Sequence, residues 1–332
     1  MSIKEIAKLA GVSTATVSRV LNGSDKVRES TASKVMEVVE QMNYRLDHVA
    51  RRMKVKSTDS LVIGLIITDI GNPFFSNVAK GVEDVAFRNK HIVMICNTNE
   101  SPEKENFFLN SLLSEKVSGA IVVPTTGNGN YSFFQDLVRD GFPMVMVDRK
   151  IEGLNIDSVS INNELGGYLA TKKLIESGHT EIGIVCGIKG LSNTTDRLSG
   201  YHRALREAGI EISQRFISYG NYVEEGGREA MKELLSLDNP PTAVFSTNNL
   251  MTLGCIKEIY HRKLSIPEEI ALIGFDDSTW AEALLPPLTT IKQPGYELGV
   301  NAAELLIKRL SNSASSTMNI VLNPELVARE SV

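Results

Sequence analysis

The side chains whose types and spacing suggest chemistry fall into two groups. The first is a polar run near the N-terminus, Gly11 to Asn22, which reads GVSTATVSRVLN. Its threonines, serines, arginine and asparagine offer the donors, acceptors and methyl groups that read base edges in DNA. The second group consists of carboxylate, amide and aromatic side chains that follow apolar runs further along the chain. Such side chains bind hydroxyl groups and stack on the C–H face of a sugar ring, so they indicate a sugar site.

The second group depends on where strands end. In doubly wound α/β folds, ligands bind beyond the carboxyl ends of the parallel strands. The residues in this position are Asp69, Asn72, Phe74, Phe75, Asp148, Asn248, Asn249, Asp276, Asp277 and Gln293. Each taken alone has an ordinary structural explanation: Phe74 or Phe75 can pack in a core, and Asp148 can cap a turn. The hypothesis of a site therefore depends on their joint placement after strands.

The polar run near the N-terminus lies within three predicted helices. Ile3, Ile6, Ala7 and Ala10 share one face of a helix over residues 3–10, and Gly11 ends it. Ser13 is placed to cap a second helix that continues to residue 22, and a third runs over about 30–42. Three short helices with a glycine turn between the first two form a helix-turn-helix, whose second helix enters the major groove. The alternative is a three-helix bundle with a polar surface.

The segments 10–13 (AGVS) and 16–22 (TVSRVLN) resemble the head of the LacI/GalR family of bacterial transcription regulators. The resemblance implies a DNA-binding head over residues 1–45. It also implies that certain residues touch bases or phosphates. These are Thr14, Ala15, Thr16, Ser18, Arg19 and Asn22.

The resemblance further implies a hinge helix over residues 46–59. In the family, two such hinges pair across a dimer and wedge an apolar side chain into the minor groove, which bends the duplex. The groove-facing positions here are Ala50, Met53 and Lys54. Met53 replaces the usual leucine, and Leu46 stands where the family often has proline, so the degree of bending is open. The alternative is a solvated linker, because this basic segment has little apolar surface to bury.

From residue 60 to 332 apolar strands alternate with amphipathic helices. The predicted strands are 61–68, 92–97, 120–123, 144–147, 182–186, 243–246 and 270–274, and the predicted helices include 103–115, 165–177, 198–208 and 226–237. This alternation indicates parallel sheets with helices on both faces. The pattern restarts near Ser158, which indicates two doubly wound subdomains. The expected fold is thus a small all-α head on an α/β body.

The body resembles the family's effector-binding and dimerisation domain, which is related to periplasmic sugar-binding proteins of type I. The resemblance implies that the two subdomains are interleaved and that an effector binds between them. The residues that it assigns to the effector site are Asn72, Phe74, Phe75, Asp148, Arg197, Tyr222, Asn248, Asp276 and Gln293. This set looks most like ribose-binding members. Asn249 departs from the family, because many members have aspartate there.

The charge is divided between head and body. The first 58 residues carry 11 Lys+Arg and 6 Asp+Glu, a net charge of +5, while the remainder carries 24 and 34, a net charge of −10. A basic head on an acidic body indicates that the head meets a polyanion. The three cysteines are far apart within or beside apolar segments, so we expect buried free thiols and a cytoplasmic protein. No apolar run is long enough to cross a membrane, and no metal or cofactor is expected.

Three functions remain to be compared. A Rossmann-type enzyme needs GxGxxG after the first strand, but that segment reads TDIGNP, and no Walker A or GxSxG motif occurs, so we expect no enzyme activity. A global catabolite regulator would answer to a phosphorylated carrier protein and tends to lose polar sugar contacts, whereas Arg197 and Asp276 are retained. The favoured hypothesis is a homodimeric repressor that binds double-stranded operator DNA and a small sugar, such as the pentose ribose.

Overall fold

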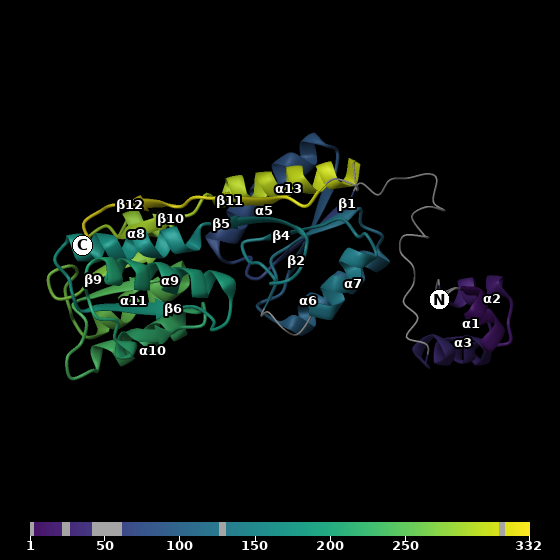
Figure 1. Ribbon diagram of the computed structural model, residues 1–332, viewed down its shortest axis with the longest axis horizontal. Helices are drawn as coiled ribbons and strands as arrows, with labels where there is room; N and C mark the ends of the chain where they lie inside the picture. The colour runs from purple at the N-terminus through teal and green to yellow at the C-terminus, as the bar shows by residue number, and fades with distance from the viewer. Residues whose placement is uncertain (1–2, 22–26, 42–61, 126–130, 312–315) are drawn as a thin grey trace. The chain divides into compact units, whose positions relative to one another are not determined.

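The structure is a computed structural model that describes residues 3–21, 27–41, 62–125, 131–311 and 316–332. They belong to two compact units, one within Met1–Ser57 and the other within Thr58–Val332. The predicted hinge, and with it Ala50, Met53 and Lys54, lies outside the described residues, as does Asn22. Figure 1 shows the elements of each unit.

The first unit contains the three predicted helices, α1 (Ile3–Leu9), α2 (Thr14–Leu21) and α3 (Glu29–Gln41). They pack around a small core of Ile6, Ala7, Val17 and Val35. Gly11 has a φ of 65°, which a residue with a side chain rarely adopts, and it lets the chain turn between α1 and α2. Ser13 Oγ accepts a hydrogen bond from the backbone N–H of Thr16 at 3.1 Å, as expected for the cap of α2.

The second unit has two lobes, each with one six-stranded sheet. The first sheet has the order β11-β5-β4-β3-β1-β2. Its strands are β1 (Val62–Ile67), β2 (Ile92–Asn97), β3 (Gly119–Val122), β4 (Met144–Val147), β5 (Asp157–Ile161) and β11 (Asn319–Leu322). All of its pairings are parallel, and β1 lies between β2 and β3, so strand order reverses at this point. Such a switch point is where doubly wound sheets place ligands.

The second sheet repeats the arrangement with the order β12-β10-β9-β8-β6-β7. Its strands are β6 (Ile182–Cys186), β7 (Ile217–Tyr219), β8 (Ala243–Ser246), β9 (Ala271–Phe275), β10 (Thr289–Lys292) and β12 (Glu325–Val327). Here β6 lies between β7 and β8, and among the strands that the structure describes only β12 runs antiparallel to its neighbour, β10. Each sheet therefore has one switch point, and both contribute strand ends to the same region.

Helices cover both faces of each sheet, because strand residues alternate between the faces. In the first lobe α5 (Pro73–Arg88) and α13 (Gly295–Ser311) pack on the face that carries Ile63, Leu65 and Ile67, and α6 (Pro102–Ser114) and α7 (Tyr131–Arg139) on the other. In the second lobe, α8 (Asn163–Glu176) and α9 (Ser192–Glu207) cover one face. The other is covered by α10 (Glu224–Leu235) and α11 (Asn249–His261), and the short α12 (Thr279–Glu282) follows β9.

The fold class agrees with the prediction, but two details differ. The strand at 157–161 does not begin the second subdomain, because β5 pairs with β4 and belongs to the first sheet. The chain then enters the second lobe at α8, returns to the first after β10, and crosses again between β11 and β12. Helix α9 begins at Ser192 rather than at residue 198, because the polar segment 192–196 forms its first turns.

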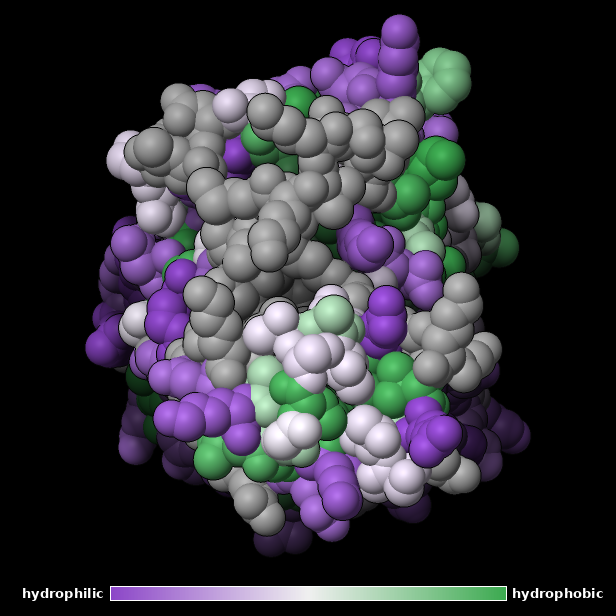
Figure 2. Space-filling view, turned by 90° about the vertical axis from the view of Figure 1, so that its right-hand side faces the viewer, coloured by the Kyte–Doolittle hydropathy of each residue, from purple (hydrophilic) through white to green (hydrophobic). Residues whose placement is uncertain are grey.

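Cys96, Cys186 and Cys255 are buried free thiols, as predicted. Among the described residues, no helix has the length and apolar character needed to cross a membrane. Figure 2 shows hydrophilic and hydrophobic residues interspersed on the face that it displays.

Candidate functional site

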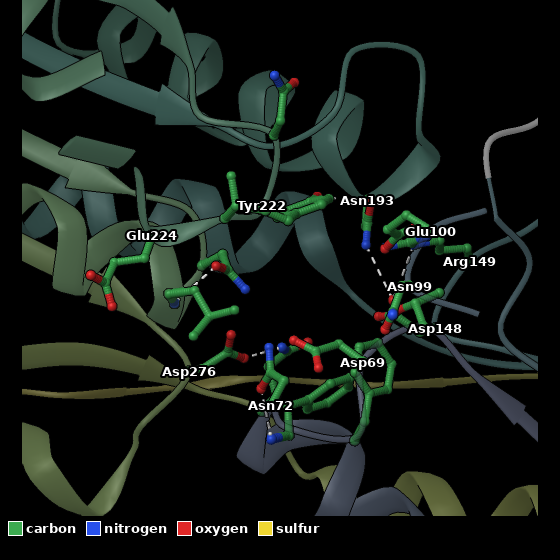
Figure 3. A pocket seen from close by; sticks show the side chains of 18 of the residues that line it. Asp69, Asn72, Asn99, Glu100, Asp148, Arg149, Asn193, Tyr222, Glu224 and Asp276 are labelled. Carbon is green, nitrogen blue, oxygen red and sulfur yellow. Dashed lines mark hydrogen bonds and ion pairs between the residues drawn. The ribbon is translucent and has the colours of Figure 1, made fainter. Parts of the chain in front are cut away.

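A cavity of about 300 Å³ lies between the two lobes at the carboxyl ends of the parallel strands. All nine residues that the sequence assigned to the effector site line it. They are Asn72, Phe74, Phe75, Asp148, Arg197, Tyr222, Asn248, Asp276 and Gln293. Figure 3 shows side chains from both lobes pointing into this cavity. Their role in binding an effector stays a prediction.

Two asparagines place helix N-termini at the cavity. Asn72 caps α5 by accepting from the N–H of Phe74 at 2.9 Å, and Asn248 caps α11 by accepting from the N–H groups of Leu250 and Met251. Asparagine suits both positions because its side-chain oxygen satisfies backbone donors that the first helical turn leaves free. The predicted site asparagines thus have a structural role as well.

The departure at Asn249 has a structural consequence. Asn249 does not line the cavity, but it makes a reciprocal amide pair with Asn72 of the other lobe, with both N···O distances 3.0 Å. Asn249 Nδ2 also donates to Ser278 Oγ at 3.3 Å. An aspartate could not donate to Asn72 Oδ1, because a carboxylate only accepts. The amide pair is therefore a contact between the lobes that depends on asparagine.

Asp276, at the end of β9, is held by the protein itself. Gln293 Nε2 donates to its Oδ1, and the backbone N–H of Asn249 lies 3.4 Å from its Oδ2. Nearby, the Arg197 guanidinium stacks on Phe275, 3.7 Å from the ring centroid. Arg197 donates to Asn163 Oδ1 at 2.8 Å and to the carbonyl of Thr247 at 2.5 Å. This end of the cavity is already organised by hydrogen bonds within the second lobe.

Asp148, at the end of β4, has more unused hydrogen-bonding capacity than Asp276. Its Oδ2 accepts from Asn193 Nδ2 across the cleft at 3.2 Å, while its Oδ1 has no hydrogen-bond partner among the described residues. The neighbouring Arg149 is buried, and its Nε likewise has no partner there. Thr68 Oγ1, which also lines the cavity, is a third buried polar atom in this condition. Buried polar atoms of this kind call for a ligand or water to satisfy them.

The two aspartates share an electrostatic environment. Burial raises the pKa of both carboxyl groups above their ordinary value, and positively charged arginines oppose part of this shift: Arg149 and Arg197 at Asp148, Arg197 at Asp276. Both residues also have a positive φ, 66° for Asp148 and 74° for Asp276. Non-glycine residues in this conformation are uncommon and cluster at ligand sites.

Aromatic side chains supply the apolar part of the cavity. The Phe74 and Phe75 rings form an edge-to-face pair with centroids 5.0 Å apart. On the opposite lobe Tyr222 donates to Asn193 Oδ1 at 3.0 Å, and its hydroxyl is 2.7 Å from Thr194 Oγ1. Burial raises the pKa of Tyr222, so the phenol stays protonated. The rings offer faces on which the C–H groups of a ligand can pack.

The structure adds residues that sequence reasoning missed, chiefly Glu100, Arg149 and Asn193. Arg149 directly follows Asp148 at the same strand end, so its position was a usable signal. Asn193 lies in the first turn of α9, which the predicted helix over 198–208 did not include. Glu100 follows β2, and only the folded chain brings it to Arg149.

In the head, the candidate residues of α2 lie at the surface. Thr14, Ala15 and Arg19 are exposed, and Thr16 and Ser18 are half-buried. Val17 points into the core of the three helices. Helix α2 therefore presents Thr14, Ala15 and Arg19 to the solvent, while Val17 anchors it in the core of the head.

Comparison with known proteins agrees with both units. Residues 2–47 match the family described as bacterial regulatory proteins, lacI family, and residues 171–332 match the periplasmic binding protein-like domain. The chain is 37% identical over 335 residues to the HTH-type transcriptional repressor PurR of Histophilus somni (strain 2336). It is 38% identical over 332 residues to the ribose operon repressor of Haemophilus influenzae. Each alignment covers 100% of this chain and 98% of the relative.

Two solved structures show the same fold. The complex of the transcriptional regulator CelR with cellobiose superposes with a TM-score of 0.77 at 29% identity and covers 100% of both chains. A LacI family transcriptional regulator from Enterococcus faecium with bound ribose has a TM-score of 0.73 at 29% identity, covering 82% of this chain and 98% of that one.

The fold and site thus define a regulator with a helix-turn-helix head and a two-lobed body of the periplasmic binding protein type. This chain belongs to the lacI family of bacterial regulatory proteins.

Proposed function

We propose that this protein is a homodimeric, DNA-binding repressor whose affinity for its operator changes when a small neutral sugar, a pentose such as ribose, binds between the two lobes. Closure of the lobes around the sugar shifts the spacing of the two hinges and so the fraction of dimer that is competent to bind DNA. No enzyme activity is part of the proposal. The similarity to a ribose operon repressor and to a ribose-bound regulator supports the choice of effector.

The observation that best supports a sugar effector is a hydrogen-bond acceptor and a hydrogen-bond donor that both lack a hydrogen-bond partner in the cavity wall. Asp148 Oδ1 and Arg149 Nε are both buried in neighbouring residues, and neither has a hydrogen-bond partner among the described residues, although Nε lies 3.6 Å from the other oxygen of Asp148. A hydroxyl group both donates and accepts, so neighbouring hydroxyls satisfy a carboxylate and a guanidinium together. The nearby Phe74 and Phe75 rings offer the apolar surface that a sugar ring requires.

The charge of the cavity argues against a phosphorylated effector. Among the described residues that line it, five are acidic (Asp69, Glu100, Asp148, Glu224 and Asp276) and two are arginines, a formal charge of −3. Arg197 is already bound to protein acceptors, and Arg149 to Glu100. A phosphate group would therefore meet more carboxylates than free cations, whereas a neutral polyol meets no such repulsion.

Calorimetry against a panel of pentoses, hexoses, phosphosugars and nucleobases tests the effector. We expect a neutral pentose to bind with the highest affinity and phosphosugars to give no heat. Binding of a nucleobase alone would replace the sugar by a planar ligand. No heat with any sugar, together with capture of a phosphorylated carrier protein, would instead support the catabolite-regulator hypothesis.

The proposed DNA contacts are Thr14, Ala15, Thr16, Ser18, Arg19 and Asn22 in the head and Ala50, Met53 and Lys54 in the hinge. Arg19→Ala should abolish selection of the operator over random DNA, because an exposed arginine on the second helix is placed to read bases. Arg28→Ala is the matched control: Arg28 is an exposed arginine of the head, and we propose that it contacts phosphate, so its loss should weaken binding to all sequences alike. Unchanged operator selectivity in Arg19→Ala would show that Arg19 does not read bases.

The proposed dimer uses the β2 edge of the first sheet. Strand β2 has no partner on its outer side among the described residues, and Ile92, Met94 and Ile95 on it are exposed, as is Phe87 at the end of α5. Ile92 is 66% and Phe87 76% exposed, and apolar side chains exposed at an unpaired sheet edge favour association. Ile92→Lys should yield monomers in sedimentation velocity. Val321→Lys, on the opposite edge strand β11, should leave the dimer intact.

A further inference from the structure

Glu100 makes a two-bond ion pair inside the cavity. Its Oε1 accepts from Nη2 of Arg149 at 2.6 Å, and its Oε2 accepts from Nη1 at 2.7 Å. The Arg149 side chain is only 4% exposed, so the pair is largely shielded from water on the arginine side. Figure 3 shows Glu100 and Arg149 beside Asp148 on one side of the cavity. A bidentate pair fixes the plane of the guanidinium, which a single hydrogen bond would not.

The hydrogen bonds of Arg149 leave one edge of the group free. A guanidinium has five N–H donors. Glu100 and the carbonyl of Pro124 take both donors of Nη1 and one of Nη2. The remaining Nε–H and Nη2–H lie side by side on the same edge of the planar group. The Asp148 Oδ2 atom is 3.6 Å from Nε, beyond a normal hydrogen bond.

The turn that carries Glu100 is held in an uncommon conformation. Asn99 and Glu100 have φ values of 50° and 59°, in the left-handed region. Glutamate rarely adopts this conformation, because its Cβ crowds the backbone there. The turn is braced by Asn97, whose Nδ2 donates to Asn99 Oδ1 at 2.6 Å and whose Oδ1 accepts from Ile70 N at 3.0 Å. The surrounding structure thus maintains a strained turn that delivers one carboxylate to Arg149.

We propose that Glu100 is a positioning residue of the effector site. It fixes Arg149 so that the free edge, Nε–H with Nη2–H, faces two neighbouring oxygen atoms of the ligand. The site would then select ligands with adjacent hydroxyl groups. This inference rests on the proposed function for its ligand class, a neutral polyol, but the orientation of Arg149 can be measured without any ligand.

The first test is the arginine Nε–H spectrum of the full-length protein by ¹⁵N NMR. A buried, bidentate Arg149 should give a slowly exchanging signal, identified by its loss in Arg149→Lys. We expect Glu100→Gln to abolish or broaden that signal, since a neutral amide cannot pair both Nη groups, whereas Glu103→Gln should keep it. Glu103 is an exposed glutamate at the start of α6 and is the matched control. An unchanged Arg149 signal in Glu100→Gln would overturn the proposal.

The second test is calorimetry with ribose. Glu100→Gln should weaken ribose binding about tenfold, as expected for loss of a charge-assisted hydrogen bond. In an Arg149→Lys background the same substitution should have no further effect, whereas a purely structural role would add to it. If the wild-type protein binds no sugar, the proposed effector is wrong, and the arginine spectrum still decides whether Glu100 positions Arg149.

Discussion

Asp148 and Asp276 occupy corresponding places in the two lobes. Each follows a strand of its sheet, each has a positive φ, and burial raises the pKa of each. They differ in their partners: Asp276 is bonded to Gln293 and Asn249 within its own lobe, while one oxygen of Asp148 has no partner among the described residues. The second lobe is thus preorganised, whereas the first retains open hydrogen-bond capacity. The same residue type in equivalent positions can therefore be satisfied within its own lobe or keep one oxygen open for the proposed ligand.

The largest expected effect is that of Asp276→Asn. An asparagine would turn its NH₂ group toward one of two N–H donors, leaving a buried donor without an acceptor. We expect a loss of about 2 kcal/mol of stability, or roughly 4–8 °C in Tm, together with loss of sugar binding. Differential scanning calorimetry and titration calorimetry measure the two. A melting temperature equal to that of the wild type would contradict the preorganised second lobe.

The same substitution at Asp148 should have the opposite effect on stability. Asp148→Asn removes a buried charge with an unsatisfied oxygen, so the ligand-free protein should gain about 0.5–1 kcal/mol. Sugar affinity should fall at least about tenfold, because the open acceptor is the atom proposed to bind hydroxyls. Thermal melts with and without sugar report both quantities. A destabilised ligand-free variant would show that Asp148 also holds the fold.

Asp277 provides a control one residue from Asp276. Its carboxylate pairs with Arg329 at 2.7 and 3.1 Å and accepts from Thr290, but it does not line the cavity. Asp277→Asn should cost about 1 kcal/mol of stability and leave sugar affinity unchanged. Reduced affinity in this variant would mean that the effects at Asp276 arise from general disturbance of the strand end.

The smallest expected effect is that of pH on sugar affinity and on stability. Only an ionised Asp148 or Asp276 accepts hydrogen bonds with both oxygens, so sugar affinity should fall as pH is lowered, beginning above the ordinary aspartate pKa of 3.8. The effect on stability has the opposite sign. The pKa of each carboxyl is higher in the folded than in the unfolded chain, so its contribution is full below 3.8 and is lost as pH rises through the folded value.

Titration calorimetry at several pH values on the wild type and Asp148→Asn distinguishes the contributions of Asp148 and Asp276 to the pH dependence of sugar affinity. The variant should lose the part of the pH dependence that Asp148 contributes. Identical pH profiles for the two proteins would exclude Asp148 as the titrating group.

The sequence predicted the fold class, and it selected residues that the structure brings to one cavity, for identifiable reasons. Apolar periodicity marked the strands, and the rule that ligands bind at strand ends then selected Asp148 and Asp276. The resemblance to a family added Arg197 and Tyr222. The prediction was wrong at β5, because a parallel strand's pattern does not say which sheet it joins. Glu100 and Asn193 were missed because no local pattern distinguishes them from surface polar residues.

The sequence alone determined which kinds of side chain are present at the candidate site, because hydrogen-bonding groups, aromatic rings and strand ends are local properties of the chain. Only the tertiary structure decided which of these groups are occupied by the protein and which stay open. Whether Asp148 or Asp276 is satisfied depends on Gln293, Asn193 and other residues far away in the chain. Likewise, the Asn72–Asn249 pair joins residues 177 positions apart, and no local pattern can specify such a contact.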